Sequence, residues 1–183
     1  LQSVFESLKN LIELRSLIFL MNQIEHINFE VFCHSLSCLK NLQMLGINIC
    51  KCKNFTDLTV KRILESITNP ELMETLCFYF LNCDKLTDES LYSIASKLEE
   101  FKSLTRLEVC TNACSNLSDS GIRELANKLP VLKELNTLTL NFSKCSKLTS
   151  DSAEDIIKAI SLLPELKNKQ VKFEECPDVN VMI

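Results

Sequence analysis

A period of 31 residues runs through most of the sequence and constrains the fold more than any other feature. Apolar residues recur at this interval in four columns. The columns are Leu42, Met73, Leu104, Leu135 and Leu166; Leu45, Leu76, Leu107 and Leu138; Ile47, Phe78, Val109, Leu140 and Val171; and Phe55, Leu86, Leu117 and Leu148. An earlier copy, Leu14-x-x-Leu17-x-Phe19, precedes the first column by 28 residues. Periods of roughly 20 to 50 residues are typical of solenoids, in which neighbouring units share one core.

Two apolar spacings follow one another within each unit. Leu138, Leu140 and Phe142 alternate with other residues, which is typical of a strand with one apolar face. Spacings of three and four come next, as between Ile122 and Leu125, and these indicate an amphipathic helix. We therefore expect about six parallel strands, with helices over residues 57–68, 88–100, 119–129 and 151–163.

Short polar pairs mark the expected helix starts. They stand at the same offset in successive units, as Thr56-Asp57, Thr87-Asp88 and Ser118-Asp119. Oxygens of such side chains accept hydrogen bonds from the free N–H groups of a first helical turn. We interpret the aspartates as helix-capping residues and not as a calcium or paired-carboxylate site, because a single site is not copied into every unit.

One further column contains small residues throughout: Thr59, Ser90, Gly121 and Ser152. Small side chains at a fixed point of each helix allow a neighbouring element to approach closely. The column therefore predicts that each helix approaches either its neighbour or the sheet closely at this point, and that a bulky residue there would disrupt stacking.

The repeated unit resembles the leucine-rich-repeat family, and within it the ribonuclease-inhibitor-like and cysteine-containing subclasses. Leu138-Thr-Leu-Asn-Phe142 and Leu86-Thr-Asp88 are also similar to the long-unit repeats of ciliates and related protists. The resemblance implies an α/β solenoid with a curved parallel sheet on the concave face and helices on the convex face. It further implies that the concave face or its edges bind protein partners. The sequence departs from the family pattern in its turn, where cysteine replaces the usual asparagine, and in having only Gly46 and Gly121 as glycines.

The extent of the repeat suggests one elongated domain over residues 1–183, built from about six units. Of the 183 residues, 46% are hydrophobic, which is enough for a continuous core. The sequence begins at Leu1 within a helix-like pattern, so we expect it to be part of a longer protein.

Charge and apolar run length argue against two classes of partner. The formal net charge is −4, whereas a nucleic-acid-binding domain usually carries a basic surface. The longest apolar runs, such as Leu76 to Leu81, fall far short of the roughly 20 residues that cross a bilayer. We therefore expect neither nucleic-acid binding nor membrane insertion.

Five of the ten cysteines form a ladder at the repeat interval: Cys52, Cys83, Cys114, Cys145 and Cys176. We expect each to be a small buried thiol that donates a weak hydrogen bond to a backbone carbonyl. The alternative is a metal or redox site formed by Cys50, Cys52 and Cys83. Structural zinc usually requires pairs spaced C-x₂₋₄-C and four ligands, so no metal and no cofactor are expected. Reduced thiols in a chain with a full apolar core favour an intracellular, cytoplasmic location.

Catalytic residues are not evident. The two histidines, His26 and His34, lie in the least regular unit, and no glycine-rich phosphate loop or nucleophile elbow occurs. We therefore expect a protein that is not an enzyme.

The strand residues between the inward leucines define the candidate binding surface. The candidate partner-binding residues are Asn48, Cys77, Tyr79, Glu108, Cys110, Thr139 and Asn141. Tyr79 is the expected anchor, because aromatic residues with a polar tip are enriched among residues that dominate binding energy. The thiols of Cys77 and Cys110 are expected to face solvent or a partner. The alternative is a solvated sheet face without a binding role.

These observations favour a protein–protein interaction scaffold that binds a partner protein of unknown identity. The resemblance to protist repeats extends this expectation to a subunit of a large intracellular assembly, cytoskeletal or ciliary. The alternative is the recognition domain of a larger regulatory protein, such as a ubiquitin-ligase substrate receptor or a nucleotide-dependent immune sensor.

Overall fold

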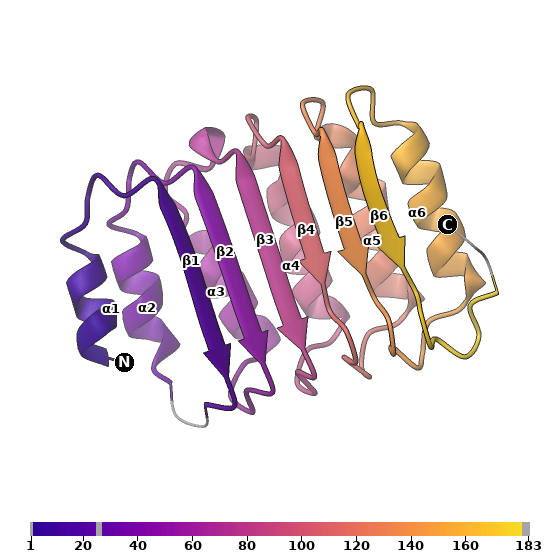
Figure 1. Cartoon of the computed structure of the whole chain (residues 1–183), viewed down its shortest axis with the longest axis horizontal. Helices are drawn as coiled ribbons and strands as arrows, with labels where there is room; N and C mark the ends of the chain where they lie inside the picture. Colours follow the sequence, from indigo (N-terminus) through magenta and orange to yellow (C-terminus); the bar gives the residue numbers. More distant parts are fainter. Residues whose placement is uncertain (1, 25–26, 181–183) are drawn as a thin grey trace.

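A single parallel sheet organises the part of the chain that the computed structural model describes, residues 2–24 and 27–180 (Figure 1). Its strands lie side by side in chain order. They are β1 (Ser16–Asn22), β2 (Met44–Cys50), β3 (Thr75–Leu81), β4 (Arg106–Cys110), β5 (Thr137–Asn141) and β6 (Asn168–Lys172). The pairing follows the repeat: Leu45 aligns with Leu76 and Leu76 with Leu107, while Leu17 aligns with Leu45 across the shorter first unit.

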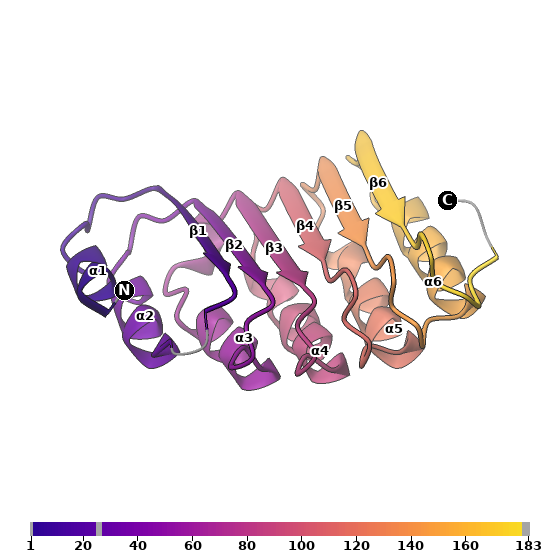
Figure 2. The same ribbon diagram turned by 60° about the horizontal axis from the view of Figure 1, so that its bottom comes forward.

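The helices all cover one face of this sheet, as the two views in Figures 1 and 2 show. They are α1 (Gln2–Leu8), α2 (Phe29–Leu36), α3 (Asp57–Glu65), α4 (Asp88–Lys97), α5 (Asp119–Lys128) and α6 (Ser150–Ser161). The four predicted helices are confirmed, with shorter α-helical bodies than expected. The last turns of the second and third continue as 3₁₀ helices, η2 (Leu98–Glu100) and η3 (Leu129–Val131). The first ends at Glu65 and is followed by a separate 3₁₀ turn, η1 (Pro70–Leu72).

The difference in width between helices and strands bends the array. A helix with its side chains is about 10 Å across, whereas neighbouring strands lie about 4.8 Å apart. The sheet therefore lies on the concave face and the helices on the convex face. The predicted α/β leucine-rich-repeat solenoid is confirmed.

The apolar columns form the core between sheet and helices. Leu45, Leu76, Leu107 and Leu138 are fully buried, as the repeat predicts. Fully burying a leucine side chain contributes about 1.5–3 kcal/mol, so each strand adds several kcal/mol through its inward residues. At the N-terminal end the core is aromatic, and the ring centroids of Phe19 and Phe32 lie 4.8 Å apart.

Close helix contact is confirmed at the small-residue column. Ser90 and Ser152 are fully buried. A Cβ atom added to Gly121 would lie 2.5 Å from Asp88 Oδ1 and 3.1 Å from Asp88 Cα, so a side chain there requires α4 to shift. The space between successive helices is thus set by the smallest residues of the repeat.

The aspartates at the helix starts have a different role from the predicted one. Thr87, Ser118 and Thr149 cap their own helices through side-chain oxygens. The Asp88 carboxylate instead accepts from the backbone N–H of Ser118 at 2.8 Å and from its hydroxyl at 2.6 Å. Interpreting the aspartates as caps of their own helices was therefore wrong. At the first helical position the side chain points sideways, toward the helix start of the following unit.

Asp119 repeats this link with one additional donor. It accepts hydrogen bonds from the N–H and the hydroxyl of Thr149, at 2.9 and 2.7 Å, and from the hydroxyl of Ser152. Burial acts to raise the pKa of the Asp119 carboxyl, but the hydrogen bonds from Ser152 and Thr149 outweigh it and lower the pKa below its ordinary value. The ionised carboxylate is therefore the form that the fold stabilises.

The cysteine ladder has the buried, hydrogen-bonded role predicted for it. The thiols of Cys114, Cys145 and Cys176 donate to carbonyl oxygens 34 residues earlier, at 3.3, 3.2 and 3.2 Å. Burial raises the pKa of the Cys83 thiol to about 12 and that of Cys145 to about 11. All ten cysteines, which lie within the described ranges, are free. The last four thiols of the ladder therefore link their units to carbonyl groups at the end of, or just after, the strand of the unit before, whereas the Cys52 thiol donates within its own unit, to the carbonyl of Cys50.

A second repeated feature accompanies the ladder in the backbone. The residue before each ladder cysteine has a positive φ, and so has the corresponding residue of the first unit. These residues are Gln23, Lys51, Asn82, Ala113, Lys144 and Glu175, with φ between 52° and 64°. This left-handed conformation is costly for residues with a Cβ atom, and glycine normally occupies it. Nothing in the sequence pattern indicated it, because none of the six is glycine.

The two outer strands differ in character. In β6, Lys169 aligns with Leu138 and replaces the leucine of the second column by an exposed cation. In β1, the equivalent position keeps the half-buried Leu17.

Among the described residues, no helix combines the length and apolar character needed to cross a bilayer.

Candidate functional site on the concave face

The concave face of the sheet contains all seven predicted binding residues. Strand alternation turns them away from the helices, and the parallel register aligns them in rows. One row is Asn48, Tyr79, Cys110 and Asn141, and the other is Cys77, Glu108 and Thr139. The structure thus brings residues from four units together on one surface.

Two adjoining hollows lie on this face. The first, which we call the apolar hollow, has a volume of about 480 Å³ and extends from β1 to β4. It is lined by Ile18, Leu20, Met44, Gly46, Asn48, Thr75, Cys77, Tyr79, Arg106 and Glu108. The second has a volume of about 450 Å³, extends from β3 to β6 and shares Tyr79, Arg106 and Glu108 with the first. The concave face is therefore hollowed, and the charged pair Arg106 and Glu108 lies at the junction of the two hollows.

Glu108, a member of the candidate set, is buried within a polar cluster on the concave face. Only 4% of its surface is exposed. Arg106 Nε donates to its Oε1 at 2.6 Å, and the Tyr79 hydroxyl donates to its Oε2. Burial raises the pKa of the Glu108 carboxyl above its usual value. Because residues on its own and the adjacent strand already donate to both oxygens, Glu108 offers an incoming partner little hydrogen-bonding capacity.

The two cysteines of the candidate site are also covered. Cys77 and Cys110 lie on the concave face as predicted, but each is only 6% exposed. Burial, aided by the nearby charge of Glu108, raises the pKa of Cys77 to about 11 and that of Cys110 to about 12. The expectation that these thiols face solvent was wrong, since larger side chains beside them cover small ones. Thiols with such pKa values are poor nucleophiles at neutral pH.

Tyr79 presents its ring to the concave face while its hydroxyl is engaged. The residue is half-buried and stands between Asn48 and Cys110 in the parallel register. Because the hydroxyl donates to Glu108, the ring is the part that remains for a partner. Asn48, Thr139 and Asn141 are half-buried as well, and Asn141 Oδ1 accepts from the Ser143 N–H at 3.1 Å.

Arg106 is a site residue that the candidate set missed. Its side chain is 52% exposed, and it lies at the junction of the two hollows. The signal was present, because strand alternation that turns Glu108 outward also turns Arg106 outward two residues earlier. Ile18 and Leu20 also belong to the surface, at 57% and 69% exposure.

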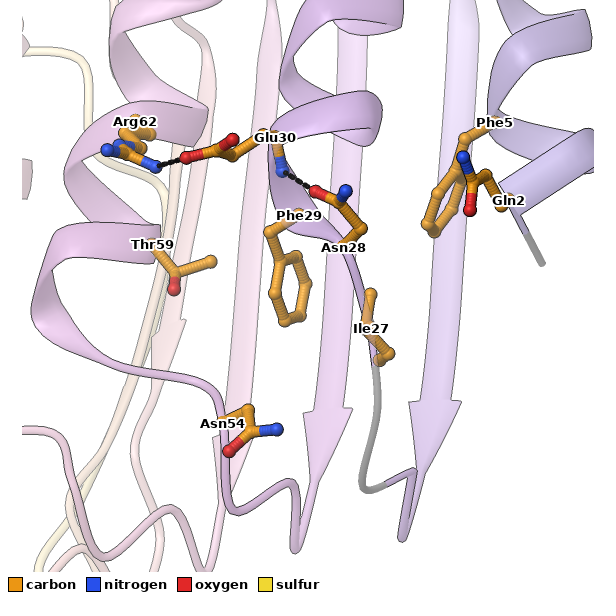
Figure 3. A pocket seen from close by; sticks show the side chains of 9 residues that line it. All are labelled: Gln2, Phe5, Ile27, Asn28, Phe29, Glu30, Asn54, Thr59 and Arg62. Atoms are coloured by element: carbon orange, nitrogen blue, oxygen red, sulfur yellow. Dashed lines mark hydrogen bonds and ion pairs between the residues drawn. The ribbon is translucent and has the colours of Figure 1, made fainter.

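A separate hollow of about 530 Å³ lies near the N-terminal ends of α2 and α3 (Figure 3). Its side chains already stabilise local structure: Arg62 pairs with Glu30 at 2.5 Å, and Asn28 caps α2. Of the two histidines named from the sequence, His26 lies outside the described residues and His34 is exposed on α2. Residues 2–24 and 27–180 contain no cluster of three or more His, Cys, Asp or Glu side chains able to hold a metal ion.

Comparison with solved structures identifies the same architecture elsewhere. The C-terminal domain of tropomodulin from Caenorhabditis elegans matches with a TM-score of 0.51 and 14% sequence identity, over 88% of this chain and 91% of that one. A chain of the Rad7 and Elc1 complex from yeast matches with a TM-score of 0.46 and 20% identity, over 96% of this chain and 48% of that one. No protein-family model and no curated protein matches the sequence. The likeness to the tropomodulin domain shows the fold alone.

Proposed function

We propose that this chain is a protein-interaction scaffold that holds a partner protein against its concave face. The observation that carries the proposal is the exposure of Ile18 and Leu20 in the same hollow that Tyr79 lines. Large apolar side chains gathered in a hollow are the usual mark of a protein-binding surface. The seven predicted residues and Arg106 line or border this surface, and we include them in the proposed site.

A binding role accounts for the chemistry of the face better than catalysis does. Both oxygens of Glu108 are occupied, and the thiols of Cys77 and Cys110 are buried with raised pKa values. A nucleophile and a base within reach of one another are the minimum for covalent catalysis. The proposed role is therefore non-enzymatic and needs no cofactor.

We base the proposed subclass and cellular setting on the resemblance of the repeat to the leucine-rich-repeat family. We include in the proposal a single leucine-rich-repeat domain over residues 1–183, of the ribonuclease-inhibitor-like, cysteine-containing kind. Ten free cysteines support an intracellular setting, where thiols stay reduced. A place in a multi-subunit cytoskeletal or ciliary assembly extends the same proposal.

Site-specific photo-crosslinking tests the binding face directly. A benzophenone amino acid replaces Leu20 on the concave face in one variant and Asn127, exposed on α5, in a second. In cells that express the protein, the Leu20 variant should crosslink to a defined partner protein and the Asn127 variant should not. Crosslinking to the same partner from Asn127 alone would place binding on the convex face and refute the proposal.

A further inference from the structure

Gly46 lines the floor of the apolar hollow and contributes no side chain to it. It stands in one row with Ile18 and Cys77, and it is buried, with the Ile18 side chain next to it. A Cβ atom at this position would meet the Ile18 side chain at 3.4 Å, which is ordinary contact, and the hollow that Gly46 lines has a volume of about 480 Å³. Met44 and the exposed Leu20 lie beside it. The hollow thus offers room for one bulky apolar side chain.

A cation stands at the other side of the same hollow. Arg106 aligns across the sheet with Thr75 and Met44. Glu108, its carboxylate partner, is almost completely buried, whereas half of the arginine side chain is exposed. In the described part of the chain Arg106 has no second carboxylate within 4.0 Å. A guanidinium has five N–H donors, so donors remain for an incoming acid.

The spacing of these features fixes the size of the ligand. Gly46 lies on β2 and Arg106 on β4, two strand spacings apart and offset by two residues along the strands, so they are roughly 12 Å apart. An extended peptide covers that distance in about three residues. From this geometry we infer that the apolar hollow binds an acidic peptide segment of the partner, with a bulky apolar side chain over Gly46 and a carboxylate about three residues later on Arg106.

Charge decides in favour of an acidic and not a basic segment. Carboxylates recognise arginine through paired, charge-assisted hydrogen bonds. Glu108 would be the group for a basic ligand, but its two oxygens already accept from Arg106 and Tyr79. The inference rests on the proposed function, since it names the chemistry of the partner that the concave face would hold.

Short peptides test the inference on the whole chain. The probe is acetyl-Ser-Phe-Ser-Gly-Glu-Ser-amide, with matched peptides that carry Gln or Lys in place of Glu, or Ser in place of Phe. Binding is followed by amide chemical shifts during titration. The acidic peptide should bind about tenfold or more tightly than the glutamine and serine peptides, the difference expected for a charged hydrogen bond or a buried aromatic ring.

Variants assign the two subsites. Gly46→Leu should fill the hollow and abolish binding, while Arg106→Gln should weaken the acidic peptide about tenfold. Because Arg106→Gln leaves Glu108 without its ion pair, the double variant Arg106→Gln with Glu108→Gln is measured as well and should show the same loss. Lys172→Gln, on the far strand β6, is the matched control and should bind normally. Melting temperatures verify that each variant is folded.

The outcomes separate this inference from the broader function. Four results would each overturn the inference. These are equal affinity for the glutamine and glutamate peptides, tighter binding of the lysine peptide than of the glutamate peptide, no binding of the glutamate peptide, and unreduced binding of the glutamate peptide by Gly46→Leu. If crosslinking from Leu20 still captures a partner protein in those cases, the scaffold function stands and the acidic specificity fails. If crosslinking fails too, both are wrong.

Discussion

The carboxylate of Asp88 in α4 accepts two hydrogen bonds from Ser118, the residue that caps α5. One side chain thereby joins the helix starts of two successive units. Hydrogen bonds that involve a charged group each contribute about 1.5–3 kcal/mol when buried, and the exposed part of this site reduces that value. We expect Asp88→Ala to lower the free energy of unfolding by about 2 kcal/mol in urea denaturation. Asp84→Ala, at an exposed position in the same unit, should change it by less than about 0.5 kcal/mol.

The same link predicts a dependence of stability on pH at Asp119. The pKa of the Asp119 carboxyl is lower in the folded chain than the ordinary value of 3.8. The stability that the ionised carboxylate adds to the fold is therefore fully present above pH 3.8. It is lost as the pH falls through the lowered folded-state pKa. Asp119→Asn should therefore be less stable than the parent chain at pH 7, and the difference should shrink below about pH 4. Urea denaturation at both pH values measures it, and a constant difference would rule out this role for the ionised carboxylate.

The left-handed residues offer a stabilising substitution. Ala113 has φ 57°, where an L residue with a Cβ atom costs roughly 1 kcal/mol more than glycine. Ala113→Gly should raise the free energy of unfolding by about 0.5 kcal/mol, since the greater entropy of unfolded glycine removes part of the gain. Ala126→Gly, in the body of α5, should lower it by about 1 kcal/mol. Thermal melting of the two variants tests this prediction. If both variants are less stable than the parent chain, the backbone conformation at Ala113 is not strained.

Two substitutions separate the role of the Tyr79 hydroxyl in stability from the proposed role of its ring in binding. Tyr79→Phe keeps the ring and removes the hydroxyl that donates to Glu108, so stability should fall by about 1 kcal/mol while partner binding changes little. Tyr79→Ala should show a similar fall in stability and should also weaken binding of the crosslinked partner by about 1–3 kcal/mol. Calorimetric titration and melting curves measure both effects. If Tyr79→Phe binds as weakly as Tyr79→Ala, the hydroxyl and not the ring is the binding group.

The repeat in the sequence was sufficient to predict the architecture. The columns of leucine and phenylalanine specified which strand residues are inward, and the spacing of three and four located the helices. The small-residue column also predicted the close contact that Gly121 makes with Asp88. These features depend on local periodicity and on the size of side chains, both of which are visible in a single sequence.

The candidate site was less predictable, because accessibility depends on neighbours from other units. Alternation gives the direction of Cys77, Glu108 and Cys110 but not the size of the side chains beside them. Glu108 is covered because Arg106 and Tyr79 both bind it. Tyr79 lies 29 positions before Glu108 in the sequence, so no local pattern encodes their contact. The link from each aspartate to the following unit was missed for the same reason.

The identical register at the three junctions between α3, α4, α5 and α6 has a consequence for how such a chain can change in length. Asp57 binds Thr87 in the same manner as Asp119 binds Thr149. Removal of residues 88–118 would join Thr87 directly to Asp119 and leave both of these junctions intact. Gene duplication or deletion can therefore lengthen or shorten the molecule in whole units, each of which alters the width of the sheet by about 4.8 Å. Ligand specificity can evolve by such steps without a new core having to be selected.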